Sequence, residues 1–324
     1  MEERIVPGAG IELETIRVRG LHEEMWRNLP LAVAIPAAVA RASGIVGRFK
    51  PDAVFGTGGY VVGPVGMAAS LRRKPLVLQL PDAVPGRTIR LLAPRAETVC
   101  VAFESSIARL KGNARVTGTP LRPEFAAIGR ARRESPRKWP LTPRRLVVFG
   151  GSQGAHRLNT AVAEGLKALL EDPGLTVHHV CGEKDREQLR AMRTGLPPAW
   201  QARYVVEAFS DDMAGLMESA DLVVARAGGS AIAEATAVGV PMVLVPYPYA
   251  GDHQRFNAEP VEQAGAAVVV PDGEFSGIRL VQEVRRLGAE PGRLARMASA
   301  SLAFGRPGAA LDVARTVLQA AGAS

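Results

Sequence analysis

The sequence is poor in cysteine and in aromatic residues, and it contains no long apolar run. Two cysteines among 324 residues, Cys100 and Cys181, are too few for a disulfide framework or a cysteine-based zinc site, so a reducing compartment is expected. The longest apolar stretch, residues 29–40, falls well short of the roughly twenty residues that a membrane-spanning helix needs, and it contains two prolines. These shortages argue against a disulfide-rich scaffold and against a chain that crosses a bilayer.

Acidic residues are scarce in the first part of the chain. Residues 1–140 contain 22 Lys and Arg against 12 Asp and Glu, whereas the remainder contains 18 against 20. Such a local excess of positive charge favours an anionic partner. Nucleic acid and an acidic membrane surface are both candidates, but the basic residues are not interleaved with aromatic ones as in RNA-binding segments. We therefore expect an anionic membrane surface as the partner, and no nucleic acid.

Short apolar runs alternate with amphipathic stretches along the whole chain, which is typical of an α/β protein. A basic, proline-containing stretch at residues 129–143 interrupts this alternation and is interpreted as an interdomain linker. The pattern predicts two doubly wound parallel sheets, with ligands bound at the carboxyl ends of the strands in a cleft between domains. We expect domains at residues 1–135 and 136–305, and a terminal helix at 306–324 that packs back on the first. The predicted strands are residues 52–55, 75–79, 98–103, 145–149, 175–180, 221–225, 242–246 and 266–270.

Two glycine-rich loops follow predicted strands. Gly56–Pro64 and Gly150–Ala155 expose backbone N–H groups beside the start of a helix, a geometry that suits a phosphate. Neither loop has the spacing of a dinucleotide-binding or Walker loop. Tight packing of strand on helix explains the first loop equally well, and Ser152 in the second could be a simple helix cap.

Two further segments carry polar groups at strand ends. Glu234 is the only charge in an apolar helix that follows a glycine turn and is predicted to stop at Gly239; it suits a ribose diol or is merely a solvated residue of the helix's first turns. The run Asp252–Asn257 offers hydrogen-bonding groups for sugar hydroxyls, although His253 is equally well a capping or surface residue. His178 and His179 are adjacent in a predicted strand, so they point to opposite faces and are interpreted as structural. No metal-ligand pattern and no Ser-His-Asp arrangement is evident.

Taken together, these segments resemble the MurG family of bacterial N-acetylglucosaminyltransferases, a group of family 28 glycosyltransferases. The resemblance implies a GT-B fold, two Rossmann-like domains that face each other across a cleft. It also implies an inverting transfer from UDP-GlcNAc to undecaprenyl-diphosphate-linked N-acetylmuramoyl-pentapeptide in peptidoglycan synthesis, without cofactor or metal. The enzyme would be peripheral, on the cytoplasmic face of the bacterial cell membrane. The matching segments are residues 56–64, 85–86, 118–122, 150–154, 209–214, 226–234, 252–257 and 262–266.

The resemblance also implies roles by position. Ser152 would hold one UDP phosphate, and the turn at Gly228, Gly229 and Ser230 the other. Glu234 would hold the ribose, and the backbone around Ser210 would meet uracil. The remaining expected ligands are Gln254 and His253 for the GlcNAc hydroxyls, Arg122 as a bridge between the domains near the donor, and Gly58, Gly59 and Tyr60 for the acceptor diphosphate.

The sequence departs from the family pattern in two places. Asp82 stands where the family has an Asn that contacts GlcNAc, and an ionised Asp accepts hydrogen bonds but cannot donate them to the acetamido group. The family's first glycine loop, which carries a His as candidate base, has no counterpart. We expect either a start at an internal Met or a fragment. The base is unassigned, with Asp82 and His253 as candidates. The alternatives are a GT-B enzyme that acts on another lipid acceptor and a truncated relative that binds UDP-sugar without turnover.

Overall fold

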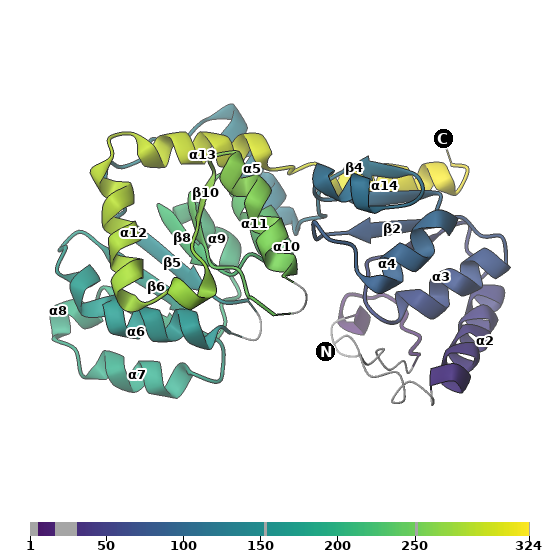
Figure 1. Ribbon diagram of the computed structural model, residues 1–324, viewed down its shortest axis with the longest axis horizontal. Helices are drawn as coiled ribbons and strands as arrows, with labels where there is room; N and C mark the ends of the chain where they lie inside the picture. Colours follow the sequence, from purple (N-terminus) through teal and green to yellow (C-terminus); the bar gives the residue numbers. More distant parts are fainter. Residues whose placement is uncertain (1–5, 17–30, 152–153, 250–251, 324) are drawn as a thin grey trace.

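The chain folds into two α/β domains, each built on a parallel sheet (Figure 1). The structure is a computed structural model that describes residues 6–16, 31–151, 154–249 and 252–323, and the side chains of residues 31–34 are not included in the description. The predicted α/β class with two parallel sheets is confirmed. In the described part of the chain, every helix is too short or too polar to span a bilayer.

The first domain has a four-stranded sheet in the order β1-β2-β3-β4, with Val77 of β2 opposite Thr98 of β3. All five residues of β2 are buried, as expected for a parallel strand covered on both faces. One cover is the last helix of the chain, α14 (Ala309–Ala320), which crosses back so that Val313 packs with Val77 and Cys100. The other elements are α2 (Leu31–Phe49), β1 (Val54–Gly56), α3 (Val62–Leu71), β2 (Leu76–Leu80), α4 (Arg87–Leu92), β3 (Thr98–Val101) and β4 (Ala114–Val116).

The second domain has a six-stranded parallel sheet in the order β10-β9-β8-β5-β6-β7. The strand order reverses between β5 and β8, which pair directly with Val147 opposite Val223. In such sheets, ligands bind outside the carboxyl ends of the strands at this switch point. The strands are β5 (Arg145–Phe149), β6 (Thr176–Val180), β7 (Tyr204–Glu207), β8 (Leu222–Ala225), β9 (Met242–Leu244) and β10 (Ala267–Val269).

Helices cover both faces of the second sheet (Figure 1). The predicted stop of the helix after β8 is confirmed, because α10 ends at Val238 and Gly239 adopts φ +79°, which favours glycine. The helices of this domain are α6 (His156–Leu170), α7 (Arg186–Thr194), α8 (Pro198–Gln201), α9 (Met213–Ser219), α10 (Gly229–Val238), α11 (His253–Gln263), α12 (Gly277–Ala289) and α13 (Arg293–Phe304), with a short 3₁₀ turn at Asp272–Glu274.

The chain enters the second domain earlier than the sequence suggests. Helix α5 (Pro123–Glu134) packs on α10, α9 and α13, and its buried Phe125 belongs to the core of the second domain. The chain therefore crosses between the domains at residues 117–122, before α5, whereas the boundary expected from the sequence lies at residue 135. The first residues of the expected linker, 129–134, are the end of this helix because its apolar face finds a partner on the second domain.

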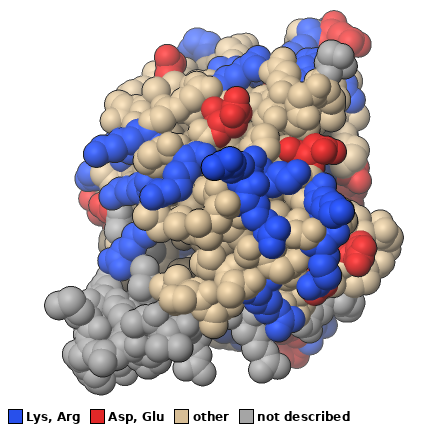
Figure 2. Space-filling view, turned by 90° about the vertical axis from the view of Figure 1, so that its right-hand side faces the viewer, with Lys and Arg blue, Asp and Glu red and all other residues tan. Residues whose placement is uncertain are grey.

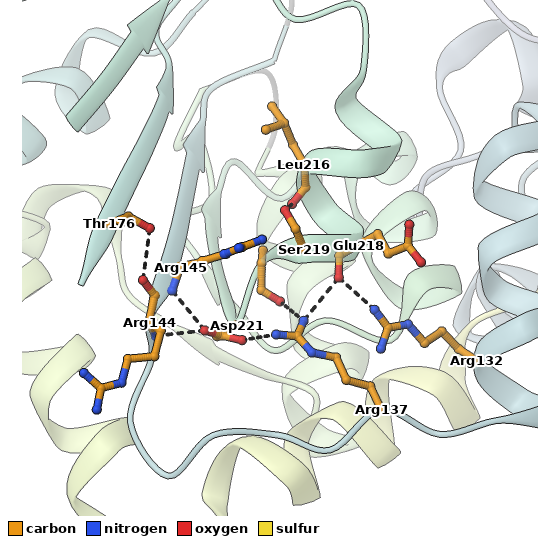
Figure 3. A network of polar contacts seen from close by, with 10 residues as sticks. Arg132, Arg137, Arg144, Arg145, Thr176, Leu216, Glu218, Ser219 and Asp221 are labelled. Carbon is orange, nitrogen blue, oxygen red and sulfur yellow. Dashed lines mark hydrogen bonds and ion pairs between the residues drawn. The ribbon is translucent and has the colours of Figure 1, made fainter. Parts of the chain in front are cut away.

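The rest of the expected linker is fixed to the second domain by buried polar contacts (Figure 3). Asp221, buried just before β8, accepts hydrogen bonds from the backbone N–H groups of Arg144 and Arg145 at 2.8 and 2.9 Å. Its other oxygen pairs with the guanidinium of Arg137, which also donates to the carbonyl of Ala220 at 2.8 Å. Asp221 thus ties the linker to the sheet at the amino end of β8.

We predict that Asp221→Ala lowers the free energy of unfolding by about 3–5 kcal/mol, because it leaves buried donors of the linker without their acceptor. Urea unfolding monitored by circular dichroism measures this change. Glu187→Ala, which removes an exposed ion pair with Arg186, is the matched control and should cost less than about 1 kcal/mol. Equal losses in the two variants would contradict a structural role for the Asp221 contacts.

Candidate donor site at the domain junction

The loop after β5 lies at the switch point of the second sheet. Gly151 and Gly154 adopt φ +85° and +72°, values that favour glycine. A Cβ on Gly154 would lie 2.6 Å from the carbonyl oxygen of Cys181, so the loop packs closely against the end of β6. Ser152, the expected phosphate ligand, lies outside the described residues, and its role stays a prediction.

The turn after β8 brings the two domains into backbone contact. Gly229 is the first residue of α10, and a Cβ there would lie 2.3 Å from the carbonyl oxygen of Pro81 in the first domain. Ser230 is exposed at the same helix start. The N–H groups at the start of α10 therefore lie directly beside the exit of β2. This arrangement offers an anion the positive end of a helix at the junction of the domains.

Glu234 lies in the second turn of α10 and pairs with Arg122. Its Oε1 is 3.4 Å from Nη2 of Arg122, and the Glu234 side chain is 22% exposed. Burial raises the pKa of Glu234, and the charge of Arg122 partly opposes this shift. Arg122 is itself half exposed and precedes α5, with its guanidinium 4.9 Å from the centre of the Phe125 ring. It thus lies where the chain enters the second domain.

The first turn of α11 presents His253 and Gln254, both partly exposed. Oε1 of Gln254 accepts a hydrogen bond from the backbone N–H of Tyr247 at 2.9 Å, which orients the amide. Tyr247 and Tyr249 form an aromatic pair whose centroids are 5.1 Å apart. The loop after β9 and the start of α11 thus form one connected surface.

Sequence reasoning missed the buried ion pair that supports this loop. Nη1 of Arg226 donates to Asp272 Oδ1 at 2.5 Å and to the carbonyl of Val245 at 3.1 Å, and its guanidinium lies 5.3 Å from the centre of the Tyr247 ring. The other oxygen of Asp272 pairs with Arg157 of α6 at 3.0 Å. One carboxylate therefore links the helix after the β5 loop to the ends of β8 and β9. No local pattern points to Asp272, because its partners come from distant segments.

The structure places the other expected residues after three further strands, β1, β7 and β2. Tyr60 follows β1, is 64% exposed, and comes after Gly58 and Gly59, whose φ values are +94° and +81°. Ser210 is partly exposed after β7, the strand two places beyond β5 in the sheet. Asp82 follows β2, and its Oδ1 accepts a hydrogen bond from Nδ2 of Asn257 at 2.8 Å. Within the described ranges, no three His, Cys, Asp or Glu side chains are grouped as metal ligands would be.

A buried polar network of side chains from α6, β6 and β7 supports the β5 loop. Asn159 of α6 donates to the carbonyl of Cys181 at 2.8 Å and to Asp185 at 2.6 Å, which uses both hydrogens of its amide. Its Oδ1 therefore accepts from Nε2 of His179 at 2.9 Å, while Nδ1 of His179 accepts from the hydroxyl of Tyr204 at 3.1 Å. Burial lowers the pKa of His179 to about 3. The prediction that His178 and His179 face opposite sides is confirmed, because His178 instead pairs with Glu207.

We predict that the contribution of this network to the free energy of unfolding falls at low pH. The pKa of His179 is near 6.5 in the unfolded chain and about 3 in the fold, so its stabilisation is complete above pH 6.5 and is lost as the pH falls toward 3. Within this range the free energy of unfolding falls by up to about 1.4 kcal/mol per pH unit. Urea unfolding of the natural chain and of His179→Gln, between pH 7 and 4.5, should show their stability difference shrinking as the pH falls. A difference that does not change with pH would contradict a neutral, buried His179.

Comparison with known proteins agrees with this geometry. Residues 145–313 match the glycosyltransferase family 28 C-terminal domain, and residues 1–101 match the family 28 N-terminal domain. The chain is 41% identical over 328 aligned positions to the UDP-N-acetylglucosamine–N-acetylmuramyl-(pentapeptide) pyrophosphoryl-undecaprenol N-acetylglucosamine transferase of Moorella thermoacetica, covering 98% of this chain and 88% of the relative. The same-named protein of Alkalilimnicola ehrlichii is 40% identical, with 99% and 88% covered.

Among solved structures, the crystal structure of MurG from Acinetobacter baumannii superposes with a TM-score of 0.78. It is 29% identical in sequence, and the match covers 98% of this chain and 88% of that one. The resemblance drawn from the sequence motifs is therefore confirmed. The chain belongs to glycosyltransferase family 28 and is a MurG-type member with the GT-B fold.

Proposed function

We propose that this protein transfers GlcNAc from UDP-GlcNAc to undecaprenyl-diphosphate-linked N-acetylmuramoyl-pentapeptide, the step that completes the lipid-linked peptidoglycan precursor. One observation carries the proposal. The exit of β8 meets the first domain beside the switch point of the second sheet, and Glu234 lies there on the helix that starts at Gly229. Relatives that align with nearly the whole chain carry the name of that transferase.

The donor binds through helix starts and one carboxylate. The N–H groups at the start of α10, with Gly229 and Ser230, hold one phosphate of UDP, and Ser152 holds the other. Glu234 accepts hydrogen bonds from the ribose diol. Its partner Arg122 lies at 3.4 Å, a long and weak contact, so the carboxylate is available to a ligand and the released guanidinium can face the diphosphate.

The GlcNAc and uracil groups of the donor lie further from the diphosphate, along the same edge of the sheet. Gln254 and His253, on the first turn of α11, meet the GlcNAc hydroxyls, and uracil meets the backbone around Ser210. Gly58, Gly59 and Tyr60 in the first domain meet the acceptor diphosphate, since the two glycines face open space and Tyr60 is exposed.

The reaction is a displacement at the anomeric carbon. The C4 hydroxyl of the muramoyl sugar attacks, the bond to the UDP oxygen breaks, and the configuration inverts. The charge that develops on UDP is stabilised by the helix N-terminus and by Arg122. A base takes the proton of the hydroxyl, and His253 and Asp82 are the candidates.

The first domain meets an anionic membrane surface at the cytoplasmic face of the cell membrane. Figure 2 shows Lys and Arg side chains spread over the outer end of this domain, with few acidic ones among them. Phe49 and Leu71 are 72% and 69% exposed and adjoin the basic residues Lys50 and Arg72. Apolar side chains flanked by cations suit a lipid surface.

A transfer assay tests the proposed activity. Purified chain, a lipid-linked muramoyl-pentapeptide and UDP-GlcNAc should give the disaccharide product, both with and without a metal chelator. UDP-glucose and UDP-GalNAc in parallel reactions test donor choice. Product only with another acceptor lipid or another sugar would contradict the proposed substrates, and UDP-GlcNAc binding without any turnover would contradict an enzyme.

We predict that Glu234→Ala weakens UDP binding by about 1–3 kcal/mol, because it removes charge-assisted hydrogen bonds to the ribose. Isothermal titration calorimetry measures the affinity. The free energy of unfolding should not fall by a comparable amount, because burial already disfavours the charged form of Glu234 in the folded protein. Glu171→Ala, an exposed pair with Arg285 at the far end of α6, is the control and should bind UDP normally. Unchanged UDP affinity in Glu234→Ala would reject the ribose assignment.

We also predict selective binding to anionic vesicles in flotation assays. Lys50→Gln combined with Arg73→Gln should weaken this binding by about 2 kcal/mol, since each basic residue near the surface contributes roughly 1 kcal/mol. Raising the salt concentration should weaken it further. The control, Lys184→Gln with Arg190→Gln, changes exposed cations of the second domain and should have no effect. Equal binding to neutral and anionic vesicles would contradict the proposed surface.

A further inference from the structure

Asn257 connects the two domains through a fully used side-chain amide. It is completely buried in α11. Its Oδ1 accepts from the backbone N–H of Ala83 at 2.7 Å. Its Nδ2 donates to Oδ1 of Asp82 at 2.8 Å and to the carbonyl of Ala227 at 3.1 Å. Three segments therefore meet at one amide: the exit of β2 in the first domain, the exit of β8, and α11.

Asp82 is held in place within the first domain and lies against the second domain. Its backbone carbonyl accepts a hydrogen bond from the hydroxyl of Ser106 at 3.3 Å, within the first domain. Its Oδ1 lies 3.1 Å from the position that a Cβ on Gly229 would occupy. The carboxylate thus lies directly over the start of α10, where the diphosphate is proposed to bind.

A second contact from α11 reaches the first domain beside this one. The guanidinium of Arg109 lies 4.5 Å from the centre of the Phe256 ring, and Phe256 is the residue before Asn257. The two neighbouring residues therefore both hold α11 against the first domain. This helix also carries His253 and Gln254, so its placement against the first domain sets where those side chains lie.

We propose that the Asp82–Asn257 hydrogen bond is an interdomain tie that positions the donor site, and that Asp82 acts as a positioning residue. It holds the exit of β2 against the turn at Gly229 and holds α11 in place before substrate arrives. The alternatives for this carboxylate are a direct ligand of the donor sugar and a base for the acceptor hydroxyl. Both make predictions that differ from those of a tie. The catalytic consequence rests on the proposed function, whereas the tie itself does not.

The test compares Asp82→Ala and Asp82→Asn in the chain of 324 residues. Alanine removes the acceptor for Nδ2 of Asn257, whereas asparagine keeps an oxygen at the same place. Small-angle X-ray scattering of the free protein should show a larger radius of gyration for Asp82→Ala and the natural value for Asp82→Asn. Asp52→Ala, at an exposed aspartate of the first domain, is the control and should leave the scattering unchanged.

Kinetics with UDP-GlcNAc provide the second readout. For a tie, Asp82→Ala should raise KM for the donor about tenfold, the size expected for a lost hydrogen bond to a charged group, and Asp82→Asn should restore KM to within about twofold. A base would instead lose about 10²–10⁴-fold in kcat in both variants. A direct sugar ligand would raise KM in Asp82→Ala without changing the scattering. Either of these results overturns the proposal.

The two readouts keep the proposals separate. If the natural chain shows no transfer, the proposed function fails, and the scattering comparison still decides the tie. If Asp82→Ala does not fold, as judged by circular dichroism, Asp82→Ser takes its place, because the serine hydroxyl is too short to reach Nδ2 of Asn257. An unchanged radius of gyration in that variant would reject the interdomain tie.

Discussion

The backbones of the two domains meet at Gly229 and Pro81, where there is no room for a side chain. A Cβ on Gly229 would lie 2.3 Å from the carbonyl oxygen of Pro81, closer than real Cβ atoms approach. Gly229 is also the first residue of α10, so one position serves both the start of the helix and the contact between domains. This constraint brings the carboxyl ends of β2 and β8 to the same place. The placement of Asp82, Asn257 and Glu234 follows from it.

Buried polar side chains, rather than apolar packing alone, fix the loops around this contact. Asn257, Arg226 and Asn159 each bind a backbone carbonyl at or just beyond the end of a strand, namely those of Ala227, Val245 and Cys181. A backbone group buried without a partner is costly, so each of these bonds restricts where its loop can lie. Hydrogen bonds are directional, which apolar contacts are not. Such side chains hold a binding loop in one place while leaving its outer face open to a ligand.

The sequence predicted the parts of the fold that local pattern determines. Apolar β-branched runs located β5 and β8 to within a residue, because parallel strands covered on both faces are apolar throughout. The strands β4 and β7 were missed, since both are short and include exposed residues. The extent of α5 was missed because its apolar face is matched only by helices that are distant in sequence. Family resemblance supplied the expected roles of Glu234 and Gln254, which residue chemistry alone left open.

The Asp82 contact shows why the candidate site could be predicted only in part. By position, Asp82 replaces an Asn that meets the donor sugar, and that comparison treats it as an isolated residue facing a ligand. In the fold it faces Asn257, whose amide already has partners for both hydrogens and for its oxygen. No pattern within a window of sequence relates two residues separated by 175 positions. A carboxylate is compatible with this position because the group opposite it donates a hydrogen bond.

The basic residues of the first 140 positions fall into two groups. One group is bound to the second domain, and the other lies at the outer end of the first. Arg132, Arg133 and Arg137 donate to backbone carbonyls of the second domain, so they hold the α5 segment in place. Their guanidinium groups are bound to the second domain, so they lie away from the outer end of the first domain. The cations at the outer end of the first domain, such as Lys50 and Arg73, are exposed beside apolar side chains. Composition counts both groups alike, whereas an anionic surface that meets the outer end of the first domain is attracted chiefly by the second group, because electrostatic attraction falls off within about a Debye length.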